Sequence, residues 1–392
     1  MMRTWSLVIL VAVLASNVSA APPAPAPEQV RGAVEKSLPY IETVSTAWMR
    51  ERNCNSCHNV TFLIWSENEA AARGLNVDRA KLSEWTKWSL ADALSDRYWF
   101  KLRPRAIVSL KSDGLSQTLL DKLTPLVGKT YLTQKDYLLA VEKAVGKEAL
   151  EVNKDRLLKA GALPNNGGGP DTLSQILLGR DSSSQDASEN ESYKAVRALL
   201  LQWQEPDGSW QAQGQLPGLK WANASEMHAC TTMWCLLAVG ADKTNDPALA
   251  GAKQRALASL KDPAPSITIQ SLALRFIVAD KFAEPAQRDA PRKDLLNRQN
   301  ADGGWSWVKE NKTSDAFATG QVLYALYIDG HGPNDPSITR AVEFLMQTQQ
   351  KDGSWQVPQE AINTRHRNLN VYNYWGTAWA TIGLLQTLPQ SK

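Results

Sequence analysis

The stretch Gln299-Asn-Ala-Asp-Gly-Gly-Trp305 is one of three related copies along this chain, and the repetition decides the fold. The other copies are Gln204-Glu-Pro-Asp-Gly-Ser-Trp210 and Gln349-Gln-Lys-Asp-Gly-Ser-Trp355. An Asp-Gly pair favours a tight turn because Gly tolerates positive φ. The first copy precedes the second by 95 residues, and the second precedes the third by 50 residues. This spacing is typical of an array of helical repeats.

Helical runs flank these turns and come in pairs. The first run of a pair is amphipathic, whereas the second is apolar nearly all round, which is typical of a buried helix. In one pair Asp262-Pro-Ala-Pro265 replaces the turn, and this missing copy accounts for the longer spacing. The predicted pairs in the region 190–388 are 191–203 with 225–240, 247–261 with 266–280, 288–299 with 314–328, and 336–350 with 371–388.

One amphipathic and one buried helix per repeat predict two concentric layers. The fold class is therefore all-α, and about six to seven such pairs favour closure into an α/α toroid. We assign residues 30–388 to this single toroid domain, with segment 30–75 as its first helix pair. The pattern is weaker in the middle of the chain, where helical pieces are expected near 115–126, 134–146 and 148–160.

The first 20 residues have the features of a cleaved signal peptide. Arg3 gives a basic start, and the apolar run from Leu7 to Leu14 is too short to span a bilayer. A Pro-rich linker follows at 21–29, and no later stretch is predicted to be a membrane span. We therefore expect an exported protein of the bacterial periplasm or extracellular space, not an integral membrane protein. The net charge of +3, with both signs mixed, does not suggest nucleic acid as a partner.

The three turns resemble the QW repeats of squalene-hopene and oxidosqualene cyclases and of the prenyltransferase-like α/α toroids. This resemblance covers residues 190–388 and implies inner and outer helices around a central cavity. In hopene cyclases the central Asp of an Asp-x-Asp-Asp motif protonates an alkene. This sequence lacks that motif. Asp315, at the start of a predicted inner helix, is the nearest candidate for a catalytic acid. The alternative is that Asp315 only caps that helix.

Four aromatic residues on the predicted inner helices are candidates for lining the cavity: Trp234, Tyr324, Trp375 and Trp379. An apolar cavity of this kind would suit an isoprenoid-like ligand. The alternative is that these side chains fill the centre of the toroid.

A second motif, Cys54-Asn-Ser-Cys57-His58, matches the attachment signature of c-type haem. In that chemistry the two thiols add to the haem vinyl groups and the histidine ligates the iron. The alternatives are a disulfide between Cys54 and Cys57, a disulfide or zinc site shared with Cys230 or Cys235, or a chance match. The combination resembles exported bacterial proteins that join such a segment to squalene-cyclase-type repeats.

A haem held by His58 has a second axial position. His228, at the start of a predicted inner helix, is the first candidate for the sixth ligand, followed by Met227 and His366. Cys230 and Cys235 lie five residues apart on the same helix, about 140° apart around its axis, and are expected to be core thiols.

Three classes of function remain open from the sequence. The first is a haem-bearing redox or electron-transfer protein with a periplasmic redox partner. The second is a terpenoid-type binder or enzyme whose cysteines are structural. The third is an interaction scaffold. The sequence leaves open whether the protein is an enzyme.

Overall fold

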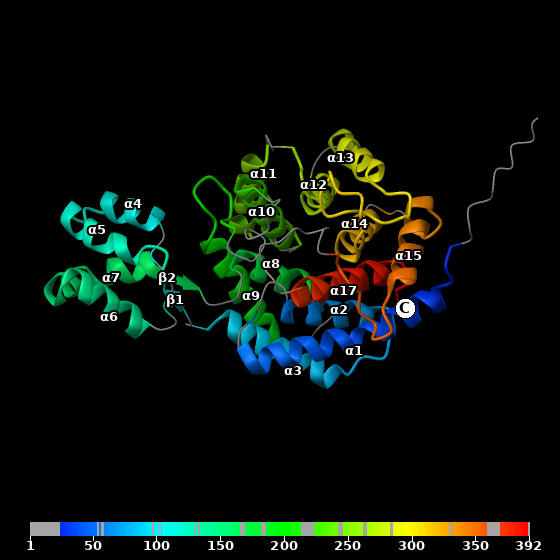
Figure 1. Cartoon of the computed structure of the whole chain (residues 1–392), viewed down its shortest axis with the longest axis horizontal. Coiled ribbons are helices and arrows are strands. Elements are labelled where there is room, and N and C mark those ends of the chain that lie inside the picture. The colour runs from blue at the N-terminus through cyan, green and yellow to red at the C-terminus, as the bar shows by residue number, and fades with distance from the viewer. Residues whose placement is uncertain are drawn as a thin grey trace, which may run out of the picture.

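Two concentric layers of helices make up most of the chain (Figure 1). The computed structural model describes residues 24–52, 55, 59–95, 98–100, 102, 104–129, 131, 134–164, 169–181, 186–212, 223–241, 246–261, 265–282, 285–328, 330, 332–358 and 369–390. The inner helices are α2 (Val60–Ala72), α8 (Pro170–Leu178), α10 (Ala224–Gly240), α12 (Ile269–Phe282), α14 (Ala316–Ile328) and α17 (Leu369–Gln386). The outer helices are α1 (Pro27–Arg52), α3 (Arg79–Ala93), α9 (Ala187–Gln202), α11 (Pro247–Ser259), α13 (Pro285–Asn297) and α15 (Pro336–Thr348).

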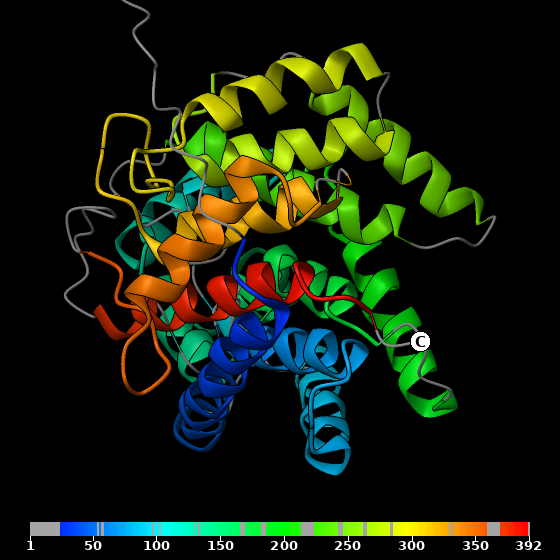
Figure 2. The ribbon, with the colours of Figure 1, turned by 90° about the vertical axis from the view of Figure 1, so that its right-hand side faces the viewer.

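The inner helices form a closed ring. Each contacts the inner helices before and after it, and α17 returns to contact α2. Figure 2 shows α17, in red, lying against the blue amino-terminal helices. The predicted α/α toroid is confirmed, and the four helix pairs predicted in region 190–388 correspond to the pairs from α9 to α17.

The tryptophan of each turn fastens an outer helix to an inner helix. Trp305 is fully buried, and its indole Nε1 donates to the carbonyl of Leu295 on α13 at 2.8 Å. Its backbone N–H donates to Thr319 Oγ1 on α14 at 3.0 Å. Trp210 and Trp355 are also fully buried and make the corresponding two bonds in their own repeats. The predicted equivalence of the three tryptophans is confirmed.

The glutamine of each turn joins one repeat to the next. Gln299 Nε2 donates to Gly303 O in its own turn and to Ser337 O at the start of α15. Gln349 Nε2 donates to Gly353 O at 3.1 Å and to Ala33 O at 2.8 Å, and Ala33 belongs to α1. The last turn is therefore bonded to the first helix, and the motif that links the repeats also closes the ring.

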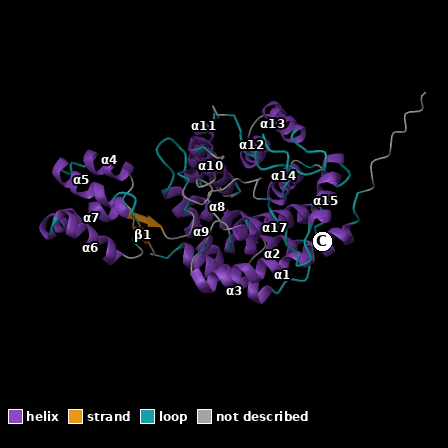
Figure 3. Ribbon diagram, in the orientation of Figure 1, coloured by secondary structure: helices purple, strands orange, loops and turns teal. Residues whose placement is uncertain are grey.

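Residues 98–164 form a lobe that the sequence prediction had not separated from the toroid. It is inserted between α3 and α8 and lies to the left in Figure 1. Its hydrophobic core, centred on the buried Tyr137, is separate from the cores of the toroid. Strands β1 (Tyr98–Phe100) and β2 (Ala162–Pro164) pair antiparallel where the chain enters and leaves the lobe (Figure 3). Its helices are α4 (Pro104–Ser112), α5 (Gln117–Leu123), the 3-10 helix η1 (Thr124–Leu126), α6 (Gln134–Val145) and α7 (Lys147–Gly161).

Candidate functional site

Polar side chains join neighbouring inner helices at three places, and we call this set of residues the polar ring. Thr61 Oγ1 of α2 donates to Gln175 Oε1 of α8 at 2.8 Å. Thr231 Oγ1 of α10 donates to Asp171 Oδ1 of α8 at 2.9 Å. Gln321 of α14 and Gln270 of α12 are joined at 3.4 Å. The ring combines one carboxylate with several amides at one end of the toroid, among helices that are otherwise apolar.

Below this ring the centre of the toroid is filled with aromatic side chains. Trp65 of α2 packs edge-on against Trp234, Tyr324 and Trp379, with ring centroids 5.6–6.2 Å apart. Trp234 and Trp379 stack on each other at 5.8 Å. Three inner helices therefore meet α2 through their aromatic rings. Trp65 is the centre of this aromatic plug, and the sequence prediction had not selected it.

The space between the polar ring and the aromatic plug is small. A cavity of about 20 Å³ is lined by three of the four predicted cavity residues, Trp234, Trp375 and Trp379, together with Gln270 and Gln321. Tyr324, the fourth, is not among its lining residues. A volume of this size holds about one water molecule. Among the described residues, the aromatic side chains therefore fill the centre and leave no room there for an isoprenoid chain.

The polar ring keeps unused hydrogen-bonding capacity. Gln270 Nε2 and Gln321 Oε1 are buried in the cavity wall without a protein partner among the described residues. An unpaired buried amide is costly, so this donor and acceptor favour a small polar group bound between them. The signal in the sequence was the presence of glutamines on helices that are otherwise almost wholly apolar.

Asp315 lies at the start of α14, where the sequence placed it, but both carboxylate oxygens serve the backbone. Oδ1 accepts from Ala318 N at 2.8 Å and Oδ2 accepts from Trp307 N at 3.0 Å. Burial raises the pKa of Asp315 to about 7, while these backbone N–H donors oppose the rise. Asp315 is not among the residues that line the central cavity. The geometry is that of a helix cap, the alternative that the sequence left open.

Cys54, Cys57 and His58 lie outside the described residues, whereas residues on both sides are described. Asn55, between the two cysteines, is fully buried and bonded to α3. Its backbone N–H donates to Asp92 Oδ2, its Nδ2 donates to Ser89 O, and its Oδ1 accepts from Ser89 Oγ at 2.9 Å. The middle of the motif is thus fixed to one outer helix.

Asn59, the residue after His58, is bonded to α17 and α1 instead of α3. Its carbonyl accepts from Tyr374 Oη of α17 at 2.8 Å, and its Oδ1 accepts from Ser45 Oγ of α1 at 3.3 Å. Trp48 on α1 and Trp88 on α3 are half-buried near the ends of the helices that flank the motif. Asn55 and Asn59 thus bond to α3 on the one hand and to α1 and α17 on the other.

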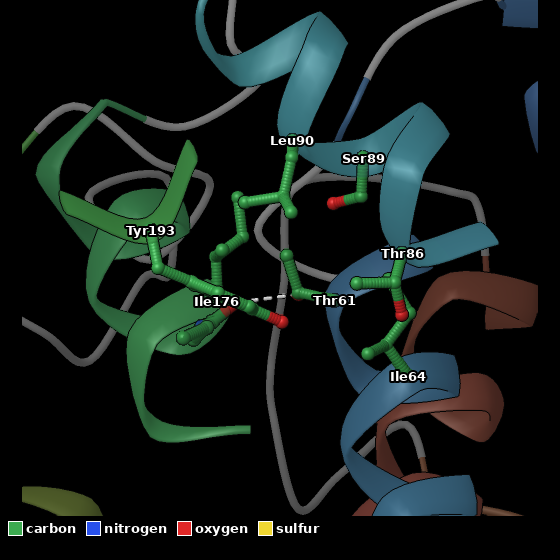
Figure 4. Close-up of a pocket in the computed structure, with 8 residues that line it drawn as sticks. Thr61, Ile64, Thr86, Ser89, Leu90, Ile176 and Tyr193 are labelled. Atoms are coloured by element: carbon green, nitrogen blue, oxygen red, sulfur yellow. Dashed lines mark hydrogen bonds between the residues drawn. The ribbon is translucent and has the colours of Figure 1, made fainter. Parts of the chain in front are cut away.

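A second small cavity connects the anchor of the motif with the polar ring. It measures about 10 Å³ and is lined by Thr61, Thr86, Ser89, Gln175 and Tyr193, among others (Figure 4). Ser89 bonds Asn55, and Gln175 also lines the central cavity. This cavity therefore lies between Ser89, which bonds Asn55, and Gln175 of the polar ring.

The candidate sixth ligands are placed as follows. His228 Nε2 is 2.7 Å from Ser209 Oγ in the first turn, so the ring has a partner in its own repeat. Met227 is buried in the core, and His366 lies outside the described residues. The role of His228 as a haem ligand stays a prediction.

Cys230 and Cys235 are both free, fully buried thiols, as expected of core cysteines. They belong to different hydrophobic clusters, because they project from different sides of α10. Burial raises the pKa of both thiols.

A larger cleft, of about 720 Å³, lies between α1, α2 and α3. Glu67 of α2 lines it and is only 6% exposed. Burial and the nearby carboxylate of Glu42 raise the pKa of Glu67 to about 7, and Lys81 opposes the rise. Lys81 and Glu42 form an ion pair of 2.7 Å between α3 and α1. Among the described residues, Glu67 and Asp315 are thus both carboxyls whose pKa burial raises to about 7.

Comparison with known proteins agrees with this architecture. The model of the squalene-hopene cyclase N-terminal domain matches residues 264–353. The fold is an α/α toroid, and residues 264–353 of it are similar to the squalene-hopene cyclase family. A comparison with curated protein sequences finds no significant match. Among the described residues of this toroid, none of the helices has the length and hydropathy needed to cross a bilayer.

Solved structures show the same fold in other proteins. A wild-type glycosidase aligns with a TM-score of 0.51 and 12% identity, over 93% of this chain and 98% of the glycosidase. A variant glycosidase in complex with glucose gives the same TM-score, identity and coverage. At this identity the likeness concerns the fold of the toroid alone.

Proposed function

We propose that this toroid is an exported protein that carries a c-type haem on Cys54, Cys57 and His58 and transfers electrons to or from a periplasmic partner. The observation that supports the proposal most is the motif together with its anchored surroundings. Two thiols and an imidazole stand at the spacing that haem attachment requires, in a chain whose first 20 residues are predicted to be an export signal. Asn55 and Asn59 hold the motif from both sides.

The chain's own residues would have distinct tasks. Cys54 and Cys57 would hold the group, and His58 would ligate its iron. Asn55 would keep the two thiols at a fixed height along α3, and Asn59 would fix the backbone next to the imidazole. A bound haem would supply a one-electron couple whose potential depends on its axial ligands and burial. His228 remains the first candidate for the second axial position.

The test is expression with the cytochrome c maturation machinery, followed by absorption spectra and intact mass. We expect a Soret band and a mass increase equal to one haem in the wild type. Cys54→Ser combined with Cys57→Ser should abolish attachment, whereas His58→Ala should leave the haem attached with altered ligation. A disulfide between Cys54 and Cys57, or matured protein without a Soret band, would refute the proposal.

The alternative is a terpenoid or isoprenoid binder with structural cysteines, held as a disulfide or zinc site. The squalene-cyclase-type repeats favour this reading, but the filled centre offers no volume for such a ligand among the described residues. The same absorption experiment separates the two proposals, because only the first requires a haem.

A further inference from the structure

Within region 190–388, the α11–α12 pair lacks the tryptophan turn, and it borders a large groove. It lies between α10, α11, α12 and α13, with a volume of about 850 Å³. Figure 1 shows α11 and α13 on the outside of the toroid with α12 between them. Its volume falls within the range of about 300–1,000 Å³ that is usual for small-molecule sites. Neither the haem nor the polar ring uses this groove.

The groove corresponds to the place that a tryptophan occupies in the complete repeats. There the indole binds the carbonyl four residues before the turn's glutamine, as Trp305 binds Leu295. The preceding turn fixes the register of α11, because Arg255 donates to Gln204 as Arg340 of α15 donates to Gln299. Leu260, at the carboxyl end of α11, therefore corresponds to Leu345, whose carbonyl accepts from the indole of Trp355. Leu260 and the neighbouring Leu257 both line the groove. The groove thus lies where a complete repeat holds its tryptophan.

The inner helix of this pair, α12, also lacks the residue that bonds a tryptophan turn. In a complete repeat a threonine on the inner helix accepts from the tryptophan backbone, as Thr319 does, four residues after the capping Asp315. In α12 the capping residue is Thr268, whose Oγ1 accepts from Ser271 N. Four residues later stands Leu272, which lines the groove. An apolar side chain thus replaces the hydroxyl that a tryptophan turn would need.

The edge of the groove is basic. Its lining includes four cationic side chains, Lys261, Arg275, Arg298 and Lys309, and a single carboxylate, Asp294. Arg298 binds Asp294 through Nε and Nη2 and donates to Ser266 O. Its Nη1 is buried and has no partner among the described residues. The groove therefore joins an apolar floor to a cationic edge with an unused guanidinium donor.

We propose that this groove binds an amphipathic anion, an apolar chain or ring that carries one carboxylate or phosphate head. The apolar part takes the place of the missing tryptophan against Leu257 and Leu272. The head lies at the basic edge, where guanidinium groups favour carboxylates and phosphates through charge-assisted hydrogen bonds. The site is independent of the proposed haem, which belongs to the α1–α2 pair.

Binding of four probes with matched chains tests the proposal in the purified full chain. The probes are dodecanoate, dodecyl phosphate, dodecanol and dodecylammonium. Their binding is measured by calorimetry and by displacement of a fluorescent fatty acid. We expect one anion to bind per chain, with the alcohol and the ammonium weaker by about tenfold or more. The preference between dodecanoate and dodecyl phosphate identifies the head group.

Two variants and a control locate the site. Ala290 is an exposed residue of α13 that lines the groove, so Ala290→Trp should fill it without altering the thermal unfolding of the protein. Arg298→Gln should weaken anion binding and leave the dodecanol affinity unchanged. Lys312→Gln removes the same charge from an exposed loop outside the lining and should bind like the wild type. Unchanged anion binding in Ala290→Trp, or equal affinity for anion and ammonium, would overturn the proposal.

Discussion

Replacing Gly353 by alanine tests whether the last turn is seated on the first helix. Gly353 has φ +86 and belongs to the turn after α15. A Cβ at this position would lie 1.9 Å from the carbonyl oxygen of Lys36 and 2.6 Å from its carbon, both in the backbone of α1. Gly330 offers a matched control, because its φ is +84 and a Cβ there would meet no atom within 4 Å.

The two substitutions share one cost and differ in the other. A left-handed backbone costs a non-glycine residue about 1–2 kcal/mol, and this applies to both positions. At Gly353 the collision with Lys36 adds about 1–3 kcal/mol, as overpacking of a rigid site does. Any shift that relieves it would also strain the bond of 2.8 Å from Gln349 to Ala33, worth about 1 kcal/mol. We expect a total loss of about 3–5 kcal/mol for Gly353→Ala and about 1–2 kcal/mol for Gly330→Ala.

Urea unfolding of the wild type and both variants measures this difference, with circular dichroism and tryptophan fluorescence as probes. The midpoint should fall clearly further for Gly353→Ala than for Gly330→Ala. Equal losses in the two variants would mean that the turn does not contact α1 in solution. The closure of the ring between the last turn and α1 would then be refuted.

Three further variants test the buried groups. Trp305→Ala should lower the free energy of unfolding by about 3–5 kcal/mol, and a loss near zero would mean an exposed indole. Asp315→Ala should lose about 1–2 kcal/mol in the same assay as a missing helix cap, and an unchanged stability would contradict the capping role. The raised pKa of Glu67, in a cleft shared with Glu42 and Lys81, means that the folded state keeps a proton that the unfolded state releases near 4.5. Glu67 should therefore make the wild type less stable as pH rises towards and through 7, by at most about 3 kcal/mol. Unfolding curves at pH 5 and pH 8 should show a smaller loss in Glu67→Gln than in the wild type, while Asp315, whose pKa is also raised to about 7, keeps its own contribution.

The sequence predicted the repeats well because a repeat combines several local signals. The Asp-Gly turn needs a glycine at positive φ, and Gly303 indeed has φ +89. The helix periodicity identifies which face is buried, and the tryptophan marks where two helices meet. Each of these signals lies within one repeat, so none of them depends on knowing the rest of the structure. The bond from Gln349 to Ala33 lies beyond such reasoning, because nothing in the sequence of α1 marks its partner.

The centre and the lobe were predicted less well for a physical reason. Apolar inner helices indicate burial, but whether their side chains fill a centre or surround a cavity depends on the diameter of the ring. Trp65 decides this by reaching the axis from α2, a helix that carries no turn motif. In the lobe the helical pieces from residue 115 onward were predicted, whereas α4 was missed. The pairing of β1 with β2, where the chain enters and leaves the lobe, involves only three residues on each strand. Asp315 is a further example, because a catalytic acid and a helix cap look the same in the sequence when they stand at a helix start.

In a repeat toroid, the places that can carry function are those where the repeat is broken. Complete turns use their glutamine and tryptophan to bind neighbouring helices and their aspartate to bond the turn itself, so they leave little surface for a ligand. The chain departs from this pattern at the α11–α12 pair, where the missing turn leaves the groove of about 850 Å³. It departs again at the α1–α2 pair, where the chain between the two helices carries the Cys54–His58 motif in place of a turn. A third departure, the lobe of residues 98–164, stands between α3 and α8 and has a hydrophobic core of its own. The two proposed sites thus lie at the two remaining pairs that lack a complete turn.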